Sequence, residues 1–279
     1  TLRVQRRNPP ALVATMDLSY AIQALEEDLV EPVSIDLVPN LADVVPQAPA
    51  LDGKRVSYIL STDTLVYNTN KWSAPPASYA DIFTPERLPT TGIGSPSTNV
   101  GIEFLAASSA AGSGKPISEA MSELKGGIEY LARFRDDIRF IYGRAQEVMP
   151  LLAAGDVNSC FVKARFLAEW INRVAPVQAV IPQEGAFYSL NCLGPVKGVA
   201  APELAMAFID IMLSPEIQKH FPSAIGSAAV NTKTEADIPE SFASIVPTLD
   251  DIEKLSLLPV LDQSEMEELN TLFNQLVAK

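Results

Sequence analysis

Apolar residues along this chain follow two spacings, one typical of strands and one typical of helices. Short runs such as "ALVATM" (11–16) and "VQAVIP" (177–182) have the length and composition of buried strands. In 17–32 the apolar residues instead recur every three or four positions, behind Asp17 as a candidate helix cap. This alternation continues from end to end, and it predicts an α/β fold with mixed, mostly parallel sheets.

A longer β-rich stretch, 55–70, is interrupted by the polar sequence Ser61-Thr62-Asp63-Thr64. We interpret it as two strands that pass between two lobes, because 279 residues exceed the usual size of one compact unit. The predicted division has lobe 1 in residues 1–62 and 192–246 and lobe 2 in residues 63–191. Residues 247–279 are predicted to form a C-terminal helical segment that packs on the lobes.

Several helices carry start signals in their sequence. Ser78 with Asp81 and Ser264 with Glu267 have the spacing of a capping box, and Ser214 followed by Pro215 is typical of a helix N-terminus. The apolar residues Ile117, Met121, Leu124, Ile128 and Leu131 form one amphipathic stripe, which predicts a helix packed on the core.

Composition excludes several classes of function. The formal net charge of −13 argues against nucleic acid or an anionic membrane as the main partner. Cys160 and Cys192 lie in no metal-binding spacing and are predicted to be buried, and the single His220 is predicted at a surface or helix end. No nucleophile elbow, P-loop or dinucleotide fingerprint is present. The sequence therefore predicts neither a cofactor, a metal nor an enzyme.

Five segments in order carry a resemblance to a known family: "LVYNTNKWSAPPASYADIFTPERL", "GDVNSCFV", "VIPQEGAFYSLNCLGPVKGV", "PELAMAFIDIMLSPEIQKHF" and "IGSAAVNTKTEADIPESF". Together they resemble the extracellular solute-binding proteins of ABC importers, in the spermidine/putrescine-like branch. The resemblance implies a type 2 periplasmic binding fold, in which two lobes joined by hinge strands close on a small molecule. It also implies a monomer outside the cytoplasm, periplasmic or extracellular, that delivers its solute to an ABC permease.

The start of the chain departs from the family pattern. Members have a further βαβ unit, on the order of 50 residues, before the segment that matches "RNPPALVATM", and a secretion signal before that. The first lobe is therefore expected to be incomplete at its N-terminus. Three explanations stay open: a fragment, a lineage that lost the unit, or a wrong alignment of the start.

The resemblance also implies where a solute would bind. The strand after Glu184-Gly185 would run through the cleft, and hydroxyls, amides and bases stand where polyamine-binding members have tryptophan and acidic residues. This exchange favours an anionic or zwitterionic solute. The predicted ligand-binding residues are Asp17, Asp63, Ser95, Ser97, Thr98, Asn99, Arg144, Lys163, Arg165, Tyr188, Ser189 and Asn191.

Simpler interpretations compete with these roles. Phe187 and Leu190 are also consistent with a core strand, Ser97 or Thr98 with a plain helix cap, and the basic residues with a solvated surface. At the level of the whole protein, the alternatives are a sensor or degenerate binding fragment that has lost transport, a polyamine-binding protein with an altered pocket, and an enzyme on the same scaffold.

Overall fold

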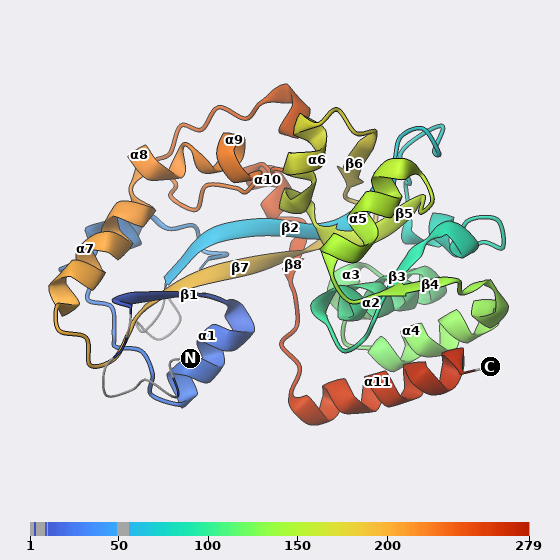
Figure 1. Cartoon of the computed structure of the whole chain (residues 1–279), viewed down its shortest axis with the longest axis horizontal. Coiled ribbons are helices and arrows are strands. Elements are labelled where there is room, and N and C mark those ends of the chain that lie inside the picture. The colour runs from blue at the N-terminus through green and yellow to red at the C-terminus, as the bar shows by residue number, and fades with distance from the viewer. Residues whose placement is uncertain (1–2, 4–8, 10, 49–55, 279) are drawn as a thin grey trace. The chain divides into compact units, whose positions relative to one another are not determined.

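The computed structural model describes Arg3, Pro9 and residues 11–48 and 56–278 (Figure 1). The chain divides into two compact units. The first unit comprises Thr1–Ser61 and Ser189–Glu240, and the second comprises Thr62–Tyr188 and Ser241–Lys279. Two strands pass from one unit to the other, at 61/62 and 188/189, where the sequence predicts 62/63 and 191/192.

The main sheet has the strand order β1-β7-β2-β5, with β6 paired to β2 and β8 paired to β7. Its strands are β1 (Val13–Asp17), β2 (Val56–Asn68), β5 (Ser159–Lys163), β6 (Val177–Val180), β7 (Ala186–Pro195) and β8 (Leu255–Leu257). A separate parallel pair is formed by β3 (Gly92–Gly94) and β4 (Phe140–Tyr142), and an isolated parallel bridge joins Thr91 to Ser159 at the start of β5.

The α/β class and the mixed sheets are confirmed, but two details of the prediction are wrong. The pairs β1–β7, β2–β5 and β2–β6 are antiparallel, so parallel pairing does not dominate among the described strands. Parallel pairing is found where strands are followed by helices, as in β3 and β4. The polar stretch at 61–64 also does not separate two strands, because β2 runs through it without interruption and pairs on both sides of it.

The first unit packs short helices around its part of the sheet. These are α1 (Leu18–Glu26), η1 (Pro39–Asp43), α7 (Pro202–Leu213), α8 (Pro215–Gln218) and α9 (Phe221–Ile225). Strand β1 lies at the edge of the sheet and is half-buried, whereas the sequence predicts a buried strand. His220 is exposed at the start of α9, as predicted.

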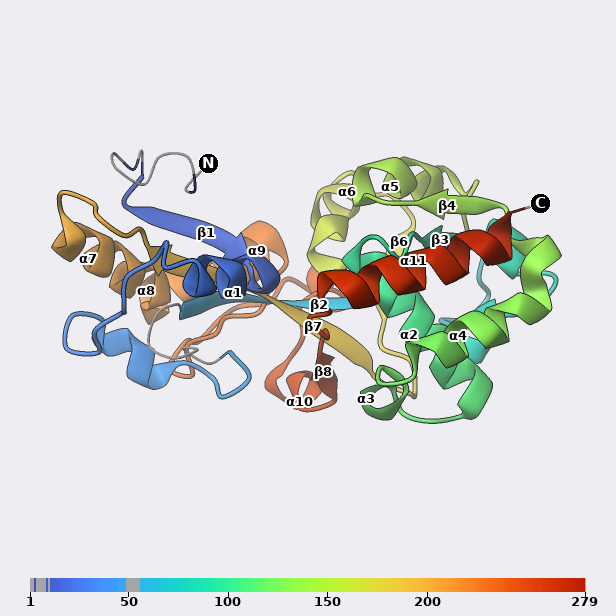
Figure 2. The same ribbon diagram turned by 90° about the horizontal axis from the view of Figure 1, so that it is seen from below.

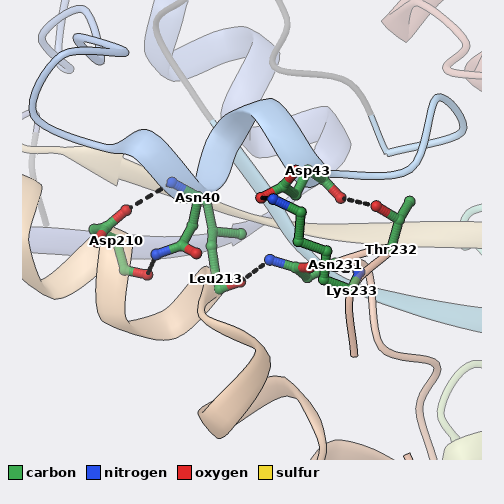
Figure 3. A network of polar contacts seen from close by, with 7 residues as sticks. All are labelled: Asn40, Asp43, Asp210, Leu213, Asn231, Thr232 and Lys233. Carbon is green, nitrogen blue, oxygen red and sulfur yellow. Dashed lines mark hydrogen bonds and ion pairs between the residues drawn. The ribbon is translucent and has the colours of Figure 1, made fainter. Parts of the chain in front are cut away.

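A polar network ties three segments of the first unit together (Figure 3). The backbone N–H of Asn40 in η1 donates to Asp210 Oδ1 in α7 at 2.9 Å. Asn231 donates its Nδ2 to the carbonyl of Leu213 at 2.8 Å and accepts from the N–H of Lys233 at 2.9 Å. The side chain of Asn231 therefore satisfies the last carbonyl of α7, that of Leu213, and has a structural role.

The second unit contains the other described helices, including the two of 15 residues. They are η3 (Tyr79–Ile82), η4 (Leu88–Thr90), α2 (Asn99–Ser113), α3 (Ile117–Ala120), α4 (Leu124–Leu131), η5 (Ala132–Asp137), α5 (Ala145–Ala154), η6 (Ala164–Leu167), α6 (Ala168–Asn172), α10 (Leu249–Ile252) and α11 (Gln263–Val277), with η7 (Glu240–Phe242) at the boundary between the units. The C-terminal α11 runs alongside α4 (Figure 2), and Lys125 pairs with Glu268 across them at 2.7 Å.

The helix starts test the predicted caps. Ser78 and Asp81 form the predicted capping box, and Ser214 accepts from the N–H of Ile217. The box predicted at Ser264 is wrong, because Asp262 and Glu265 have the same spacing two residues earlier and begin α11 there.

The predicted stripe at 117–131 is interrupted by a turn, which gives α3 and α4 in place of one helix. Its residues still pack as predicted: Ile117, Leu124, Ile128 and Leu131 are buried in the core, and Met121 lies against it.

Helix α2 is the centre of the second unit's core. Its residues 101–110 are all buried, and its Phe104 contacts Phe161 of β5 edge to face, with ring centroids 5.7 Å apart. Helix α4 crosses α2 closely enough that a Cβ atom on Gly127 would lie 2.0 Å from the carbonyl oxygen of Leu105. The neighbouring Gly126 has room, since its nearest neighbour would be Ser109 Oγ at 3.8 Å.

These two adjacent glycines predict opposite effects. Gly127→Ala is expected to lower the free energy of unfolding by about 1–3 kcal/mol, because the helices must move apart. Gly126→Ala is expected to raise it by about 0.5–1 kcal/mol, because alanine restricts the unfolded chain and favours helix. Urea denaturation of both variants measures the difference, and equal effects would contradict the close helix crossing.

The network of the first unit gives a second prediction. Asn231→Ala leaves the buried carbonyl of Leu213 without its donor and is expected to lower the free energy of unfolding by about 1–3 kcal/mol. The matched control is Thr232→Ala, which removes an exposed hydrogen bond to the Asp43 carbonyl and should change stability by less than about 0.5 kcal/mol. Thermal and urea denaturation compare the two, and a larger loss in Thr232→Ala would contradict the assignment.

Candidate functional site

Three parallel strands of the second unit end at one edge. Gly92–Gly94 of β3 pair in parallel with Phe140–Tyr142 of β4, and the bridge from Thr91 to Ser159 gives β5 the same direction. Ligands of α/β folds commonly bind outside the carboxyl ends of such strands. The candidates at this edge are Ser95, Ser97, Thr98 and Asn99 after β3, Arg144 after β4, and Lys163 and Arg165 at the end of β5.

Strand β2 adds Asp63 to the same edge. It runs antiparallel to β5, and Asp63 lies directly opposite Lys163 in the register of the two strands. Asp63 is fully buried and Lys163 is half-buried. Opposite charges in directly paired positions attract each other, and burial lowers the screening of that attraction by water.

The loop after β3 leaves the start of α2 open. Thr98 occupies the cap position, but its hydroxyl donates to the carbonyl of Ser95 at 2.8 Å and does not cap the helix. The hydroxyls of Ser95 and Ser97 share a hydrogen bond of 2.9 Å. Within the described residues, no acceptor binds the first two backbone N–H groups of the helix, those of Asn99 and Val100. These groups and the positive end of the helix dipole favour an anion.

At the start of α5, a carboxylate of the chain lies close to the helix N-terminus. The Glu147 carboxylate accepts hydrogen bonds from the backbone N–H groups of Gly143 at 2.9 Å and Arg144 at 3.2 Å. These bonds lower the pKa of Glu147. Glu147 thus binds the two N–H groups that precede the helix, and the side chain of Arg144 is exposed.

Arg165, in η6, is half-buried beside the exposed Phe166, with its guanidinium carbon 5.1 Å from the ring centre. Its Nε atom is buried and has no hydrogen-bond partner among the described residues. Since a buried donor without an acceptor costs free energy, this atom is suited to an acceptor supplied from outside the protein.

Sequence reasoning missed the most unusual residue of the second unit, Glu103. It lies in α2 with 1% of its surface exposed, and neither carboxyl oxygen has a hydrogen-bond partner within the described part of the chain. Burial and repulsion from Asp63 raise the pKa of Glu103 well above its ordinary value of 4.5, and attraction to Lys163 opposes the increase. The available signal was one acid within the otherwise small and apolar "NVGIEFLAASSA".

Three candidates from the sequence lie in the first unit. Asp17 and Asn191 are directly paired between β1 and β7, and Asn191 donates its Nδ2 to Asp17 Oδ1 at 2.6 Å. Asp17 also occupies the cap position of α1, but its side chain makes no capping hydrogen bond to this helix. The Oδ1 atom of Asn191 and the Oγ atom of Ser189 are buried and have no hydrogen-bond partner among the described residues. Both face the same side of β7, two residues apart.

The rest of β7 has a different role. Phe187 and Leu190 are core residues, with 0% and 1% of their surface exposed. Tyr188 lies on the opposite face of β7 from Phe187 and Ser189, and its burial raises its pKa. The structure therefore does not group Tyr188 with Ser189 and Asn191.

The Pro-Gln-Glu-Gly corner before β7 is an anchor. The carboxylate of Glu184 accepts from the hydroxyl of Ser78 and from the N–H of Tyr79, the latter at 3.2 Å. The hydroxyl of Tyr79 donates to the carbonyl of Gly185 at 2.9 Å. The corner thus holds η3 against the start of β7, which explains why a glutamate stands in it.

The cysteines are buried as predicted. Cys160 and Cys192 are both 0% exposed and form no disulfide, and burial raises the pKa of the Cys160 thiol. Among the described residues, no cluster of three or more His, Cys, Asp or Glu side chains is arranged to hold a metal ion. The same residues include no helix with the length and apolarity that a membrane crossing requires.

Comparison with known proteins adds to this geometry. The model of the bacterial extracellular solute-binding protein family matches residues 1–244. The chain belongs to this family. No curated protein matches it significantly in sequence.

Solved structures show the same fold. A spermidine/putrescine ABC transporter substrate-binding protein from Streptococcus pneumoniae has a TM-score of 0.81 at 17% identity, covering 98% of this chain and 85% of that one. An ABC transporter substrate-binding protein from Bradyrhizobium japonicum has 0.81 at 18%, covering 99% and 86%. An extracellular solute-binding protein from Bordetella parapertussis has 0.77 at 23%, covering 97% and 83%. These values confirm the periplasmic-binding-protein-like α/β fold.

The buried Glu103 predicts a pH dependence of stability. Because its pKa is raised in the folded protein, the native state keeps a proton that the unfolded chain loses above about pH 4.5. Stability from this residue is present below that pH and is lost as pH rises toward the native pKa. Glu103→Gln cannot ionise, so its free energy of unfolding should rise relative to that of the wild type with increasing pH.

The control for this experiment is Glu147→Gln. The pKa of Glu147 is lowered in the folded protein, so its contribution is present above the ordinary value and is lost in acid. Urea denaturation from about pH 5 to about pH 9 compares both variants with the wild type. A constant difference between Glu103→Gln and the wild type over this range would contradict the raised pKa.

Proposed function

We propose that this chain is the solute-binding component of an ABC-type importer, and that its solute is a small anion or zwitterion bearing a carboxylate, phosphate or phosphonate group. Family membership supports solute binding. The proposal includes a periplasmic or extracellular location, a membrane permease as partner, a monomeric state, and release of the solute without chemical change. The solved structures named above are too distant in sequence to indicate the solute, so its class is argued from the site.

The open N-terminus of α2 at the same sheet edge as Lys163 is the observation that carries the solute class. The backbone N–H groups of Asn99 and Val100 offer two donors that have no acceptor among the described residues. The register of β2, β3, β4 and β5 brings Lys163 to the edge from which this helix starts. Free N–H groups, a helix dipole and an ammonium together favour a carboxylate or phosphate.

The charges at this edge argue against a polyamine. An extended ammonium ligand needs carboxylates and aromatic faces that are not otherwise engaged. Asp63 faces Lys163, and the raised pKa of Glu103 favours its neutral form. Arg165 adds a second cation. The net charge of these side chains is therefore not negative, and Lys163 would repel an ammonium ligand.

The first unit, taken by itself, also carries polar side chains that were predicted to bind a solute. Asp17 and Asn191 form a carboxylate–amide pair, and Ser189 has an unengaged hydroxyl on the same face of β7 as Asn191. This combination suits the ammonium or hydroxyl groups of a zwitterion or hydroxy acid. Capture by closure of two lobes stays a prediction from the family resemblance.

The experiment is a thermal-shift screen with organic acids, amino acids, phosphonates and polyamines, followed by calorimetric titration of the best stabiliser. A carboxylate, phosphate or phosphonate is expected to raise the melting temperature, since a ligand that binds only the native state stabilises it. Stabilisation by polyamines alone would overturn the solute class. Lack of any stabiliser would favour the sensor or degenerate-fragment alternative.

Lys163→Ala is expected to weaken binding of the best stabiliser at least about tenfold, the value of one charge-assisted hydrogen bond. Lys219→Ala, at an exposed position of the first unit, is the matched control and should leave the affinity unchanged. Equal effects of the two substitutions would remove Lys163 from the site.

A further inference from the structure

A cavity of about 310 Å³ lies in the second unit, between the end of η5, the start of β4 and the end of α11. It is lined by Arg135, Ile138, Arg139, Ile141 and Val277. Both arginines and Ile141 are exposed, so solvent reaches the cavity. Pockets that hold small ligands have volumes of roughly 300–1,000 Å³, so this cavity is large enough for a ligand at the small end of that range.

This cavity is separate from the proposed solute site. Arg139 directly precedes β4, whereas Arg144 and Lys163 lie at the carboxyl ends of β4 and β5. The end of α11 lies beside the start of β4 (Figure 2), and Arg135 of η5 donates from Nη2 to the carbonyl of Ala278 just after α11. The cavity and the solute site therefore lie at opposite ends of β4.

One side of the cavity is apolar. Ile138 is buried in the core of the second unit, and Val277 packs against the same core. Ile141 lies on the opposite face of β4 from Phe140 and Tyr142, whose rings stack with centroids 6.1 Å apart. Its side chain is 40% exposed. The three aliphatic side chains therefore offer an apolar surface to a ligand in the cavity.

The two arginines make the cavity positive. The side chain of Arg139 has no hydrogen bond or ion pair with the described residues. Arg135 uses one of its N–H donors on the Ala278 carbonyl, which leaves others for a ligand and offsets the negative end of the α11 dipole. The neighbouring acids Asp136 and Asp137 are not among the lining residues. A guanidinium without a partner beside an apolar surface suits an anion that carries an apolar group.

We propose that this cavity is a second binding site, distinct from the solute site, for a small organic anion with an apolar body, of the class of alkyl or aryl carboxylates. The carboxylate pairs with the guanidinium of Arg139, and Arg135 supplies a second cation. The apolar body lies against Ile138, Ile141 and Val277. This inference does not depend on the class of the solute bound at the other end of β4.

The test uses hexanoate as the probe and the isoleucine δ1 methyl NMR signals of the full chain as the readout. The signals of Ile138 and Ile141 are assigned by their loss in Ile138→Val and Ile141→Val. Hexanoate is expected to shift both signals in a saturable way. Acetate has the same charge without the chain, and hexanol has the chain without the charge, so each is expected to bind at least about tenfold more weakly. Equal binding of either one, or no saturable shift with hexanoate, would overturn the proposal.

Arg139→Gln is expected to weaken hexanoate binding at least about tenfold, because the charge-assisted pair is lost. Arg133→Gln is the matched control, since Arg133 is an exposed arginine of η5 that does not line the cavity. Ile141→Ser is a second variant at an exposed position and should also weaken binding, because it removes part of the apolar surface. Melting temperatures check that all three variants stay folded. Equal affinities of Arg139→Gln and Arg133→Gln would overturn the role of Arg139.

Lys163→Ala separates this site from the solute site. The shifts of the Ile138 and Ile141 signals on titration with hexanoate are expected to be the same in Lys163→Ala as in the wild type. Their disappearance in this variant would mean that hexanoate acts through the solute site, and it would overturn the second site. Unchanged shifts together with a failed solute screen would leave the second site standing and count against the proposed solute alone.

Discussion

Asp63 on β2 and Lys163 on β5 face each other across two antiparallel strands, and the polar edge of the second unit depends on this pair. A fully buried carboxylate is costly unless a cation or donors balance it, and the cost is several kcal/mol in a protein interior. Lys163, a cation, lies directly opposite it and is half-buried at the carboxyl end of β5. The register of the two strands therefore places Lys163 at the carboxyl end of β5, opposite Asp63.

Glu103 makes the arrangement unusual. Ionisation of a second acid close to Asp63 would add negative charge in the core, and the burial of Glu103 opposes it. The core around it is otherwise small and apolar, with α2 buried along most of its length and held tightly by Gly127 of α4. Such packing gives the carboxyl no room to reach water, so its charge is controlled by its electrostatic neighbours.

Local sequence rules predicted what depends on local chemistry, such as the capping box at Ser78, the cap at Ser214 and the burial of Cys160. The resemblance to solute-binding proteins predicted the family and the fold. The meeting of Glu103 with Asp63 and Lys163 was not predictable, because it depends on the register of strands and a helix far apart in sequence. Where two equivalent signals compete, as Asp262 and Ser264 do, spacing alone does not choose between them.

Hydrogen exchange with mass spectrometry tests the central claim, that the start of α2 and the end of β5 form the anion site of the second unit. The backbone N–H groups of Asn99 and Val100 have no acceptor in the part of the chain that the structure describes, and they should exchange rapidly in the solute-free protein. The account predicts that the best anionic stabiliser slows exchange in peptides covering residues 95–102 and 159–167. Protection confined to other segments, with exchange at Asn99 and Val100 unchanged, would contradict it.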